Sequence, residues 1–175
     1  MIDVPTLSTA RLLLRPFSVR DLDAYATICA DPEVMRYLGE GRPLARADAW
    51  RQMAMFLGHW ELRGYGMWAV EERRSGVLVG RIGFMEPEGW PGFELGWTLG
   101  RSWWGKGYAT EGAREALAFA FARLGKERVI SLVHPDNHAS IRVAERLGES
   151  LEGRTLLLGH EVLVYGVRRA ARHTG

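Results

Sequence analysis

A glycine-rich turn that contains a lysine lies between a strand-like run ending near Leu99 and an alanine-rich helix. Gly105 and Gly107 flank Lys106 at the point where the helix must begin. The first backbone N–H groups of a helix have no acceptor within the helix and lie at the positive end of its dipole. Glycine lets a ligand approach the backbone closely. This spacing therefore predicts an anion site, most often one for a phosphate or pyrophosphate group.

Two common nucleotide-binding motifs are similar to this turn, and neither fits. From Gly100 the spacing follows a P-loop as far as Lys106, but Gly107 stands where Ser or Thr should hold magnesium. A dinucleotide-binding turn needs a third glycine where the chain has Thr110. It also needs an acidic residue after a second strand about twenty residues later, and none is present.

Further motifs surround the turn at fixed separations. They are Thr9-x-Arg11-Leu12-x-Leu14-Arg15, Glu94-Leu95-Gly96-Trp97, Trp104-Gly105-Lys106-Gly107-Tyr108-Ala109-Thr110-Glu111, and Asn137-x-x-Ser140-Ile141-Arg142-x-x-Glu145-Arg146-Leu147-Gly148. With these motifs in this order the chain resembles the GNAT acetyltransferases, in particular the branch with the ribosomal-protein N-terminal acetyltransferases. Two residues depart from the family pattern. Trp104 replaces the Gln or Arg of many members, although this branch commonly has Trp there, and Glu149 stands where an aromatic residue usually follows.

The resemblance implies an α/β (α+β) GNAT fold over residues 1–175, taken as a single domain. Its sheet is seven-stranded, mixed and mostly antiparallel, and the two parallel strands at its centre splay apart. The implied cofactor is acetyl-CoA (coenzyme A), with the pantetheine arm in the opening and the pyrophosphate on the glycine-rich turn. The residues implied for cofactor binding are Trp97, Thr98, Leu99, Trp104, Gly105, Lys106, Gly107, Tyr108, Ala109, Thr110 and Asn137.

The implied reaction is the attack of an amine on the thioester of acetyl-CoA, in a ternary complex. An ammonium group must first lose a proton, so a general base is useful. Glu94, a carboxylate in an otherwise apolar strand, is the candidate, and a salt bridge to an arginine is the equally weighted alternative. A backbone N–H near residues 97–99 would stabilise the developing oxyanion.

Two residues of the later motif have family roles and ordinary structural alternatives. Ser140 matches the residue that donates a proton to the leaving thiolate, and Asn137 matches a pantetheine ligand. Both residue types are also frequent helix caps. Lys106 either adds charge near the phosphates or is simply solvated.

The amine acceptor is a protein N-terminus or a small molecule. The expected acceptor surfaces are the helices of residues 32–66 and the loop of residues 86–92. Trp90, Trp50, Trp60 and Tyr37 either line an aromatic pocket there or pack in the core. The alternative function is a non-catalytic acyl-CoA-binding or regulatory module of the same fold. A further alternative is a peptide-recognition protein without a cofactor. In such a protein the turn of Gly105 and Gly107 would only connect a strand to a helix.

Composition excludes several classes of protein. The 23 basic and 21 acidic residues are mixed along the chain, so no nucleic-acid arm is expected. No apolar run approaches a membrane span, and the single Cys29 permits no internal disulfide, which is typical of a cytoplasmic protein. The histidines lack metal-ligand spacing, so no metal is predicted. Symmetric pairs are common among oligomers, and a homodimer through the terminal hairpin is one expectation.

Hydrophobic periodicity predicts the elements that hold these residues. Apolar positions Trp50, Met53, Ala54 and Leu57 form a helical stripe expected to be core. Gly125 and Gly148 are expected to end helices. Strands are predicted over residues 11–17, 67–72, 77–84, 93–99, 128–133, 156–158 and 161–165, and helices near residues 18–29, 50–64, 107–124 and 137–147. Asp31 and Pro32 are predicted as the cap and first residue of a further short helix.

Overall fold

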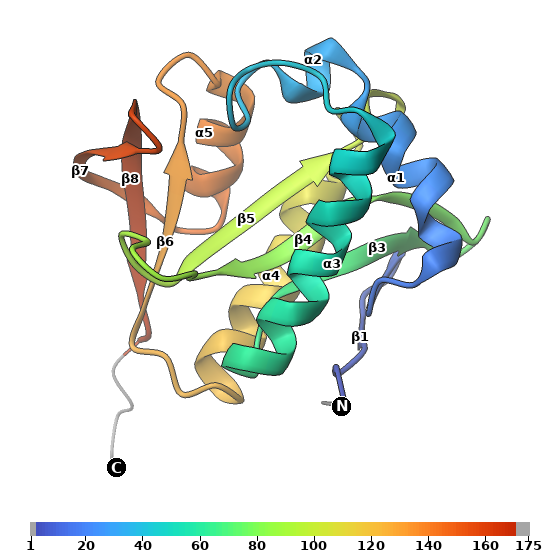
Figure 1. The fold of residues 1–175 in the computed structure, drawn as a ribbon. Coiled ribbons are helices and arrows are strands. Elements are labelled where there is room, and N and C mark those ends of the chain that lie inside the picture. The colour runs from blue at the N-terminus through green and yellow to red at the C-terminus, as the bar shows by residue number, and fades with distance from the viewer. Residues whose placement is uncertain (1–2, 171–175) are drawn as a thin grey trace.

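A computed structural model describes residues 3–170 of the chain. Within them, eight strands form one sheet in the order β1-β2-β3-β4-β5-β6-β8-β7 (Figure 1). Neighbouring strands are antiparallel except for the parallel pair β5 and β6. The strands are β1 (Leu7–Ser8), β2 (Leu12–Arg15), β3 (Met67–Glu72), β4 (Val77–Met85), β5 (Glu94–Leu99), β6 (Arg128–Val133), β7 (Ser150–Leu157) and β8 (His160–Arg168).

The mixed, mostly antiparallel sheet with a central parallel pair is confirmed, but it has eight strands within residues 3–170 where seven were expected. The strand that the sequence did not reveal is β1. Its two residues pair with Leu13 and Leu14 of β2, and two residues are too few to show the alternation of a strand. The terminal hairpin is also longer than predicted, because β7 and β8 extend well beyond its turn at Leu158 and Gly159.

Helices cover both faces of the sheet (Figure 1). The helices α1, α2 and α3 lie on one face and α4 on the other, with α5 beside β6. Their bounds are α1 (Leu22–Cys29), α2 (Pro32–Met35), α3 (Arg46–Arg63), α4 (Tyr108–Ala122) and α5 (His138–Arg146), and short 3₁₀ turns cover η1 (Val19–Asp21) and η2 (Arg101–Trp103). Gly125 and Gly148 follow the ends of α4 and α5 with φ of 66° and 86°, as predicted.

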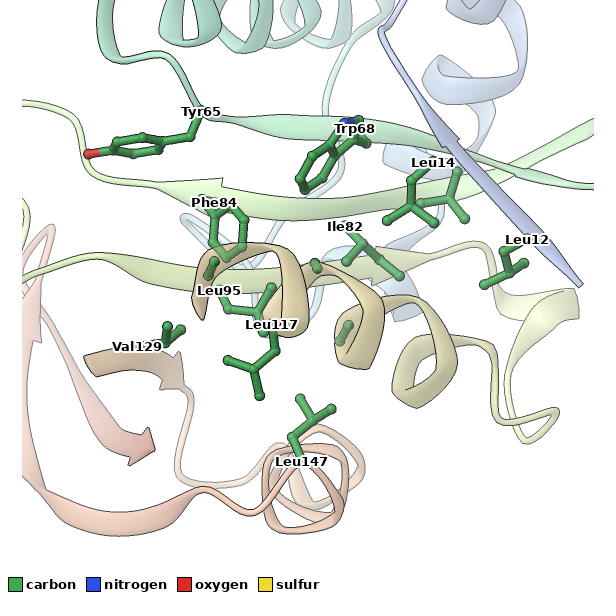
Figure 2. Packing of buried hydrophobic residues seen from close by; sticks show 14 of the residues in the cluster. Leu12, Leu14, Tyr65, Trp68, Ile82, Phe84, Leu95, Leu117, Val129 and Leu147 are labelled. Carbon is green, nitrogen blue, oxygen red and sulfur yellow. The ribbon is translucent and has the colours of Figure 1, made fainter. Parts of the chain in front are cut away.

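The larger part of the core lies between α4 and the sheet (Figure 2). Leu117 of α4 packs with Ile82, Phe84 and Leu95 of the two central strands, and these three strand residues are fully buried. Gly112 brings the helix unusually close, since a Cβ there would lie 2.5 Å from Ile82 Cδ1. Each such apolar side chain contributes about 1.5–3 kcal/mol by its burial. The packing fixes α4, and with it the turn that precedes α4, against β4 and β5.

The stripe predicted for α3 is wrong. Trp50 and Leu57 are exposed, with relative exposures of 54% and 40%, and Ala54 is exposed as well. The buried stripe is instead Ala49, Met53, Phe56 and Trp60, at helical spacing. Of the predicted residues, Met53 alone belongs to it. Periodicity identified the helix, but the polar and apolar residues of α3 are too mixed to identify its buried face.

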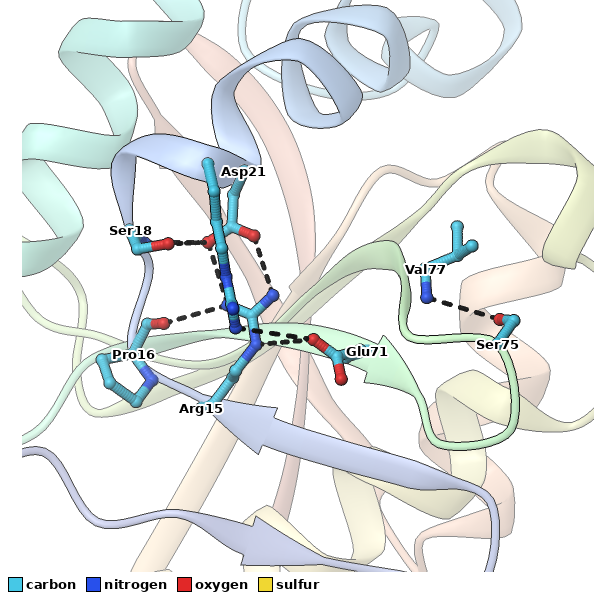
Figure 3. Close-up of polar contacts among 8 residues, drawn as sticks. Arg15, Pro16, Ser18, Asp21, Glu71, Ser75 and Val77 are labelled. Carbon is cyan, nitrogen blue, oxygen red and sulfur yellow. Dashed lines mark hydrogen bonds and ion pairs between the residues drawn. The ribbon is translucent and has the colours of Figure 1, made fainter.

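A buried ion-pair cluster joins η1 to the sheet on the α1 side (Figure 3). Arg15 of β2 donates two hydrogen bonds to Asp21, of 2.8 and 2.9 Å, and one of 2.9 Å to Glu71 of β3. Burial alone would raise the pKa of Asp21, but hydrogen bonds from Arg15 and Ser18 hold it below its usual range. The cluster therefore anchors the entry to α1, one wall of the cleft described next.

Candidate active site

The parallel strands β5 and β6 separate soon after they meet. They share one register pair, Glu94 opposite Ile130, and the Ile130 N–H donates to Phe93 O at 3.0 Å. Further along, Ser131 Oγ donates to Leu95 O at 2.8 Å in place of a backbone bond. Because peptide groups alternate along a strand, the N–H and C=O of Trp97 also face this opening. The expected splay is present, and its β5 edge has the backbone of an unpaired strand.

The glycine-rich turn leads from the end of β5 to α4. Gly105 and Gly107 have φ of 71° and 78°, a region that favours glycine, and Gly107 is the N-cap of α4. Within residues 3–170, the N–H groups of residues 105–110 have no acceptor. The N–H of Trp104 differs, because it donates to Arg101 O at 3.1 Å. The turn thus presents a run of free donors at a helix N-terminus, which suits a pyrophosphate.

Arg11 and Glu111 hold this turn in place. Arg11 donates to Glu111 at 2.6 Å and to Lys106 O at 2.9 Å, and its guanidinium lies 4.5 Å from the centroid of the Tyr108 ring. Burial would raise the pKa of Glu111, but bonds from Thr9 and Arg11 lower it. Lys106 Nζ lies 4.7 Å from the centroid of the Trp103 ring. These contacts fix the turn through side chains and leave its amides free.

Glu94 lies on β5 beside the opening, on the α3 side of the sheet. Trp90 Nε1 donates to Glu94 Oε2 at 2.6 Å. Burial raises the pKa of Glu94 to about 7, although the Trp90 bond, the charge of Arg81 and the Leu132 N–H act to lower it. Among the described residues, no cationic side chain lies within ion-pair distance of Glu94. The geometry does not show the salt bridge that was the alternative to a general base.

Ser140 and Asn137 lie together at the N-terminus of α5. Asn137 Oδ1 accepts from the Ser140 N–H at 3.1 Å, so its side-chain oxygen caps the helix. Ser140 Oγ accepts from Trp97 Nε1 at 3.2 Å, across the opening from β5. The side-chain oxygen of Asn137 is therefore a helix cap, which was the alternative to a pantetheine ligand. The Ser140 hydroxyl keeps its own proton available to a group in the opening.

A cleft of about 1070 Å³ contains the opening and continues under the α2–α3 loop. Glu94, Trp97, Thr98 and Ser140 line it. Two of the predicted aromatic residues, Tyr37 and Trp90, also line it. The other two do not: Trp50 lies on the exposed face of α3, and Trp60 is 1% exposed in the core.

Two buried or stacked histidines position the walls of this cleft. His59 Nδ1 donates to Tyr65 O at 2.7 Å and its Nε2 accepts from the Glu86 N–H at 3.0 Å, which fixes the start of the loop that carries Trp90. The His134 ring lies 4.9 Å from the Tyr37 ring, and its Nδ1 accepts from the Asp136 N–H. Within residues 3–170, no group of three or more metal-binding side chains is found.

Comparison with known proteins agrees with this geometry. The family model described as "Acetyltransferase (GNAT) domain" matches residues 11–149, which is most of the chain. The chain belongs to the GNAT acetyltransferase family. It is 30% identical to the N-acetyltransferase p20 of Bacillus licheniformis over 150 residues, 85% of this chain and 84% of that protein.

Solved GNAT structures have the same fold. An acetyltransferase of Agrobacterium tumefaciens superposes with a TM-score of 0.86 and 32% identity, covering 97% of each chain. RimL, a ribosomal L7/L12 α-N-protein acetyltransferase in complex with coenzyme A, superposes with a TM-score of 0.76 at 22% identity, covering 94% of this chain and 98% of that one. The chain is thus a GNAT N-acetyltransferase, of a family that uses acetyl-CoA. No helix in the described part of the chain is long and apolar enough to span a membrane.

A second carboxyl group, that of Glu149, contacts Ser131 of the cleft wall, and the sequence motifs did not identify it as functional. Glu149, which replaces the usual aromatic residue, is 4% exposed and has its Oε1 3.0 Å from Ser131 Oγ. Ser131 also donates to Leu95 O. The Ser131 hydroxyl has one proton, which the bond to Leu95 O uses. The contact with Glu149 is then a hydrogen bond only if the Glu149 carboxyl is protonated and donates to Ser131 Oγ. Burial raises the pKa of Glu149 to about 7, in agreement with this arrangement.

We predict that Glu149→Gln flattens the pH dependence of stability. A carboxyl with a pKa near 7 in the fold and about 4.5 when unfolded binds its proton more tightly in the fold. Its contribution to the free energy of unfolding is therefore present below pH 4.5 and falls by about 3 kcal/mol as pH rises to 7. Urea unfolding between pH 4.5 and 8 should show a shallower fall in the variant than in the wild type.

Glu161→Gln is the matched control, because Glu161 forms an exposed ion pair with Arg154 on the same terminal hairpin. That variant should keep the wild-type fall between pH 5 and 7. A Glu149→Gln protein with the full wild-type slope would show that Glu149 is ionised in the fold.

Proposed function

We propose that this GNAT chain transfers an acetyl group from acetyl-CoA to a primary amine, on a protein N-terminus or a small molecule, by direct attack in a ternary complex. The observation that carries the proposal is the position of Glu94. Its carboxyl group lies at the opening between β5 and β6, in the same cleft as Ser140. An amine in the cleft and a thioester in the opening would meet beside it.

The residues present fit acetyl-CoA, whose thioester supplies the acetyl group. Gly105, Lys106, Gly107, Tyr108, Ala109 and Thr110 offer their free N–H groups to the pyrophosphate. Trp97 offers its unpaired backbone C=O to a pantetheine amide N–H, with Thr98 and Leu99 continuing the strand. Trp104 contributes by holding the turn against the end of β5, since its indole N–H donates to Leu99 O at 2.8 Å.

The chemistry assigned to the chain's own residues is proton transfer and charge stabilisation. Glu94, with a pKa near 7, accepts a proton from the ammonium group, directly or through a water molecule, and the neutral amine then attacks the thioester carbon. The Trp97 N–H would stabilise the negative charge that develops on the acetyl oxygen. When the C–S bond breaks, Ser140, which accepts from Trp97 Nε1, would give its proton to the departing sulfur and regain a proton from the nitrogen of the new amide through water.

Thiol release from acetyl-CoA, measured against a panel of amines and N-terminal peptides, tests the proposal. Initial rates at several concentrations of both substrates should give intersecting double-reciprocal lines, the pattern of a ternary complex. Parallel lines would mean a covalent acetyl-enzyme and would contradict direct attack. Binding of acetyl-CoA without thiol release from any amine would favour the non-catalytic module.

We predict that Ser140→Ala lowers kcat by about 100-fold, the lower end of single acid–base effects. Alanine keeps the helix, because the Asn137 cap bonds to the backbone N–H of residue 140. The dissociation constant of acetyl-CoA, measured by calorimetry, should change less than threefold. An unchanged kcat would remove Ser140 from the reaction.

A further inference from the structure

The arginines that line the cleft differ in their partners. Arg42 and Arg51 form ion pairs with Glu40 and Asp48, both at 2.6 Å. Arg36 lies 3.8 Å from Glu33. Arg81 of β4 also lines the cleft, yet within residues 3–170 it has no carboxylate at ion-pair distance. It is therefore a cation in a partly closed space without a counter-charge in contact.

Arg81 and its neighbour Thr98 each have a polar side-chain atom without a hydrogen-bond partner. Arg81 is the register partner of Thr98 on β5, so the two side chains lie beside each other on one face of the sheet. Arg81 Nε and Thr98 Oγ1 are both buried and have no hydrogen-bond partner, and Thr98 as a whole is 7% exposed. Buried polar groups in folded proteins are nearly always paired. Two adjacent unpaired groups that line a cleft indicate a site for a ligand.

The contacts that Arg81 does make are with neutral groups. Its NH1 group lies 3.5 Å from Met67 Sδ, its guanidinium lies 5.2 Å from the centroid of the Phe56 ring, and the buried Tyr25 hydroxyl lies beside it. A thioether is a poor acceptor, and an aromatic face does not satisfy the N–H fork of a guanidinium. The fork matches a carboxylate, which accepts two parallel hydrogen bonds.

Arg81 lies within reach of the proposed reaction centre. Glu94, Gly96 and Thr98 share one face of β5, so Thr98 lies two strand repeats, about 13 Å, from Glu94. Arg81 contacts the Met67 side chain, and this side chain extends to Gly96. A Cβ added to Gly96 would lie 3.1 Å from Met67 Cε. The guanidinium is thus directed back along β5 toward Glu94. A ligand carboxylate on Arg81 would lie several bonds from a group at Glu94.

We infer that the acceptor of this enzyme is an amine that also carries a carboxylate, with Arg81 and Thr98 binding the carboxylate while the amine faces Glu94. The inference rests on the proposed function and adds a substrate class to it. The separation along β5 fits an amine and a carboxylate several bonds apart. Arg81 determines specificity in this arrangement and takes no part in the proton transfers.

The test compares matched acceptors. 4-Aminobutyrate and 6-aminohexanoate are set against n-butylamine and n-hexylamine, which have amines of similar basicity and no carboxylate. A peptide arm sets Ala-Asp-Ala amide against Ala-Asn-Ala amide, and separates a small-molecule source of the carboxylate from an acidic N-terminal segment. The wild type should have a kcat/KM at least about 30-fold higher for the carboxylate member of one pair.

The charge of Arg81 lowers the pKa of Glu94, so the variants are compared at pH 9, where Glu94 is ionised with or without that charge. Arg81→Met should abolish the preference there by lowering kcat/KM about 30- to 100-fold for the carboxylate acceptor and less than threefold for the neutral amine. Arg81→Lys keeps the charge without the fork and should retain part of the preference. Arg51→Met, at a cleft arginine already paired with Asp48, is the matched control and should leave the preference unchanged. Unchanged acetyl-CoA affinity shows that each variant is folded.

Equal use of both members of every pair by the wild type would overturn the inference, and so would equal losses on both members in Arg81→Met. If no panel amine releases thiol, binding of 6-aminohexanoate to the complex with coenzyme A is measured by tryptophan fluorescence. The inference would then be overturned if the wild type did not bind 6-aminohexanoate, or if Arg81→Met bound it equally well. The proposed function fails separately, when acetyl-CoA does not bind or no amine of any charge is acetylated.

Discussion

Replacement of Glu94 by Gln lowers kcat by about 10²–10⁴-fold, the range of a general base, and removes the acidic limb of the pH–rate profile. In the wild type, activity should rise with an apparent pKa near 7, because burial holds the pKa of Glu94 at about that value and the reactive form is the carboxylate. Activity is therefore lost as pH falls through 7. Glutamine keeps the size of the side chain and can still accept from Trp90 Nε1, but it cannot take up a proton.

Glu88→Gln provides the matched control for this variant. Glu88 lies in the same loop as Trp90 and its side chain is fully exposed, so its loss should change neither kcat nor the profile. Acetyl-CoA affinity should stay within about threefold in both variants. A Glu94→Gln enzyme with the wild-type pH–rate profile would exclude Glu94 as the base.

Replacement of Gly107 by Val should weaken acetyl-CoA binding by at least about 100-fold. Gly107 has a φ of 78° and caps α4, in a region where a β-branched residue is strongly disfavoured. A Cβ there would lie 3.5 Å from the Arg11 guanidinium, an ordinary contact, so the fold has room for it. The added methyl groups and the strain would disturb the free amides of the turn. Calorimetric titration with acetyl-CoA measures the loss.

Gly76→Val is the control for Gly107→Val, because it introduces the same backbone strain at a turn that does not contact acetyl-CoA. Gly76 has a φ of 69° in the β3–β4 turn, and a Cβ added there would have no other atom within 4 Å. The variant should lose similar stability in thermal unfolding but bind acetyl-CoA like the wild type. Retained affinity in Gly107→Val would mean that the pyrophosphate lies elsewhere.

The local parts of the site were predictable from sequence because each depends on neighbours in the chain. The turn of Gly105 and Gly107 is one such case, since only glycine readily adopts its positive φ and a helix follows at once. The parallel arrangement of β5 and β6 follows from the helix between them. The caps at Asn137, Gly125 and Gly148 are similarly local.

The remaining features depend on contacts between distant segments. Glu149 appeared only as a departure from the family pattern, and its bond to Ser131 spans 18 residues. Arg81 carries no motif, and its lack of a counter-charge is visible only when every neighbouring side chain is placed. The buried face of α3 was mistaken because Trp50 and Leu57 suggest a core, whereas the packing of Phe56 and Trp60 decides which way the helix faces.

Calorimetric titration of the wild-type protein with acetyl-CoA, repeated with Glu94→Gln and Gly107→Val, tests the central claim most directly. The predicted result is one site per chain with micromolar affinity, retained in Glu94→Gln and lost in Gly107→Val. Wild-type protein that binds no acetyl-CoA would contradict the proposed site and the reaction assigned to it.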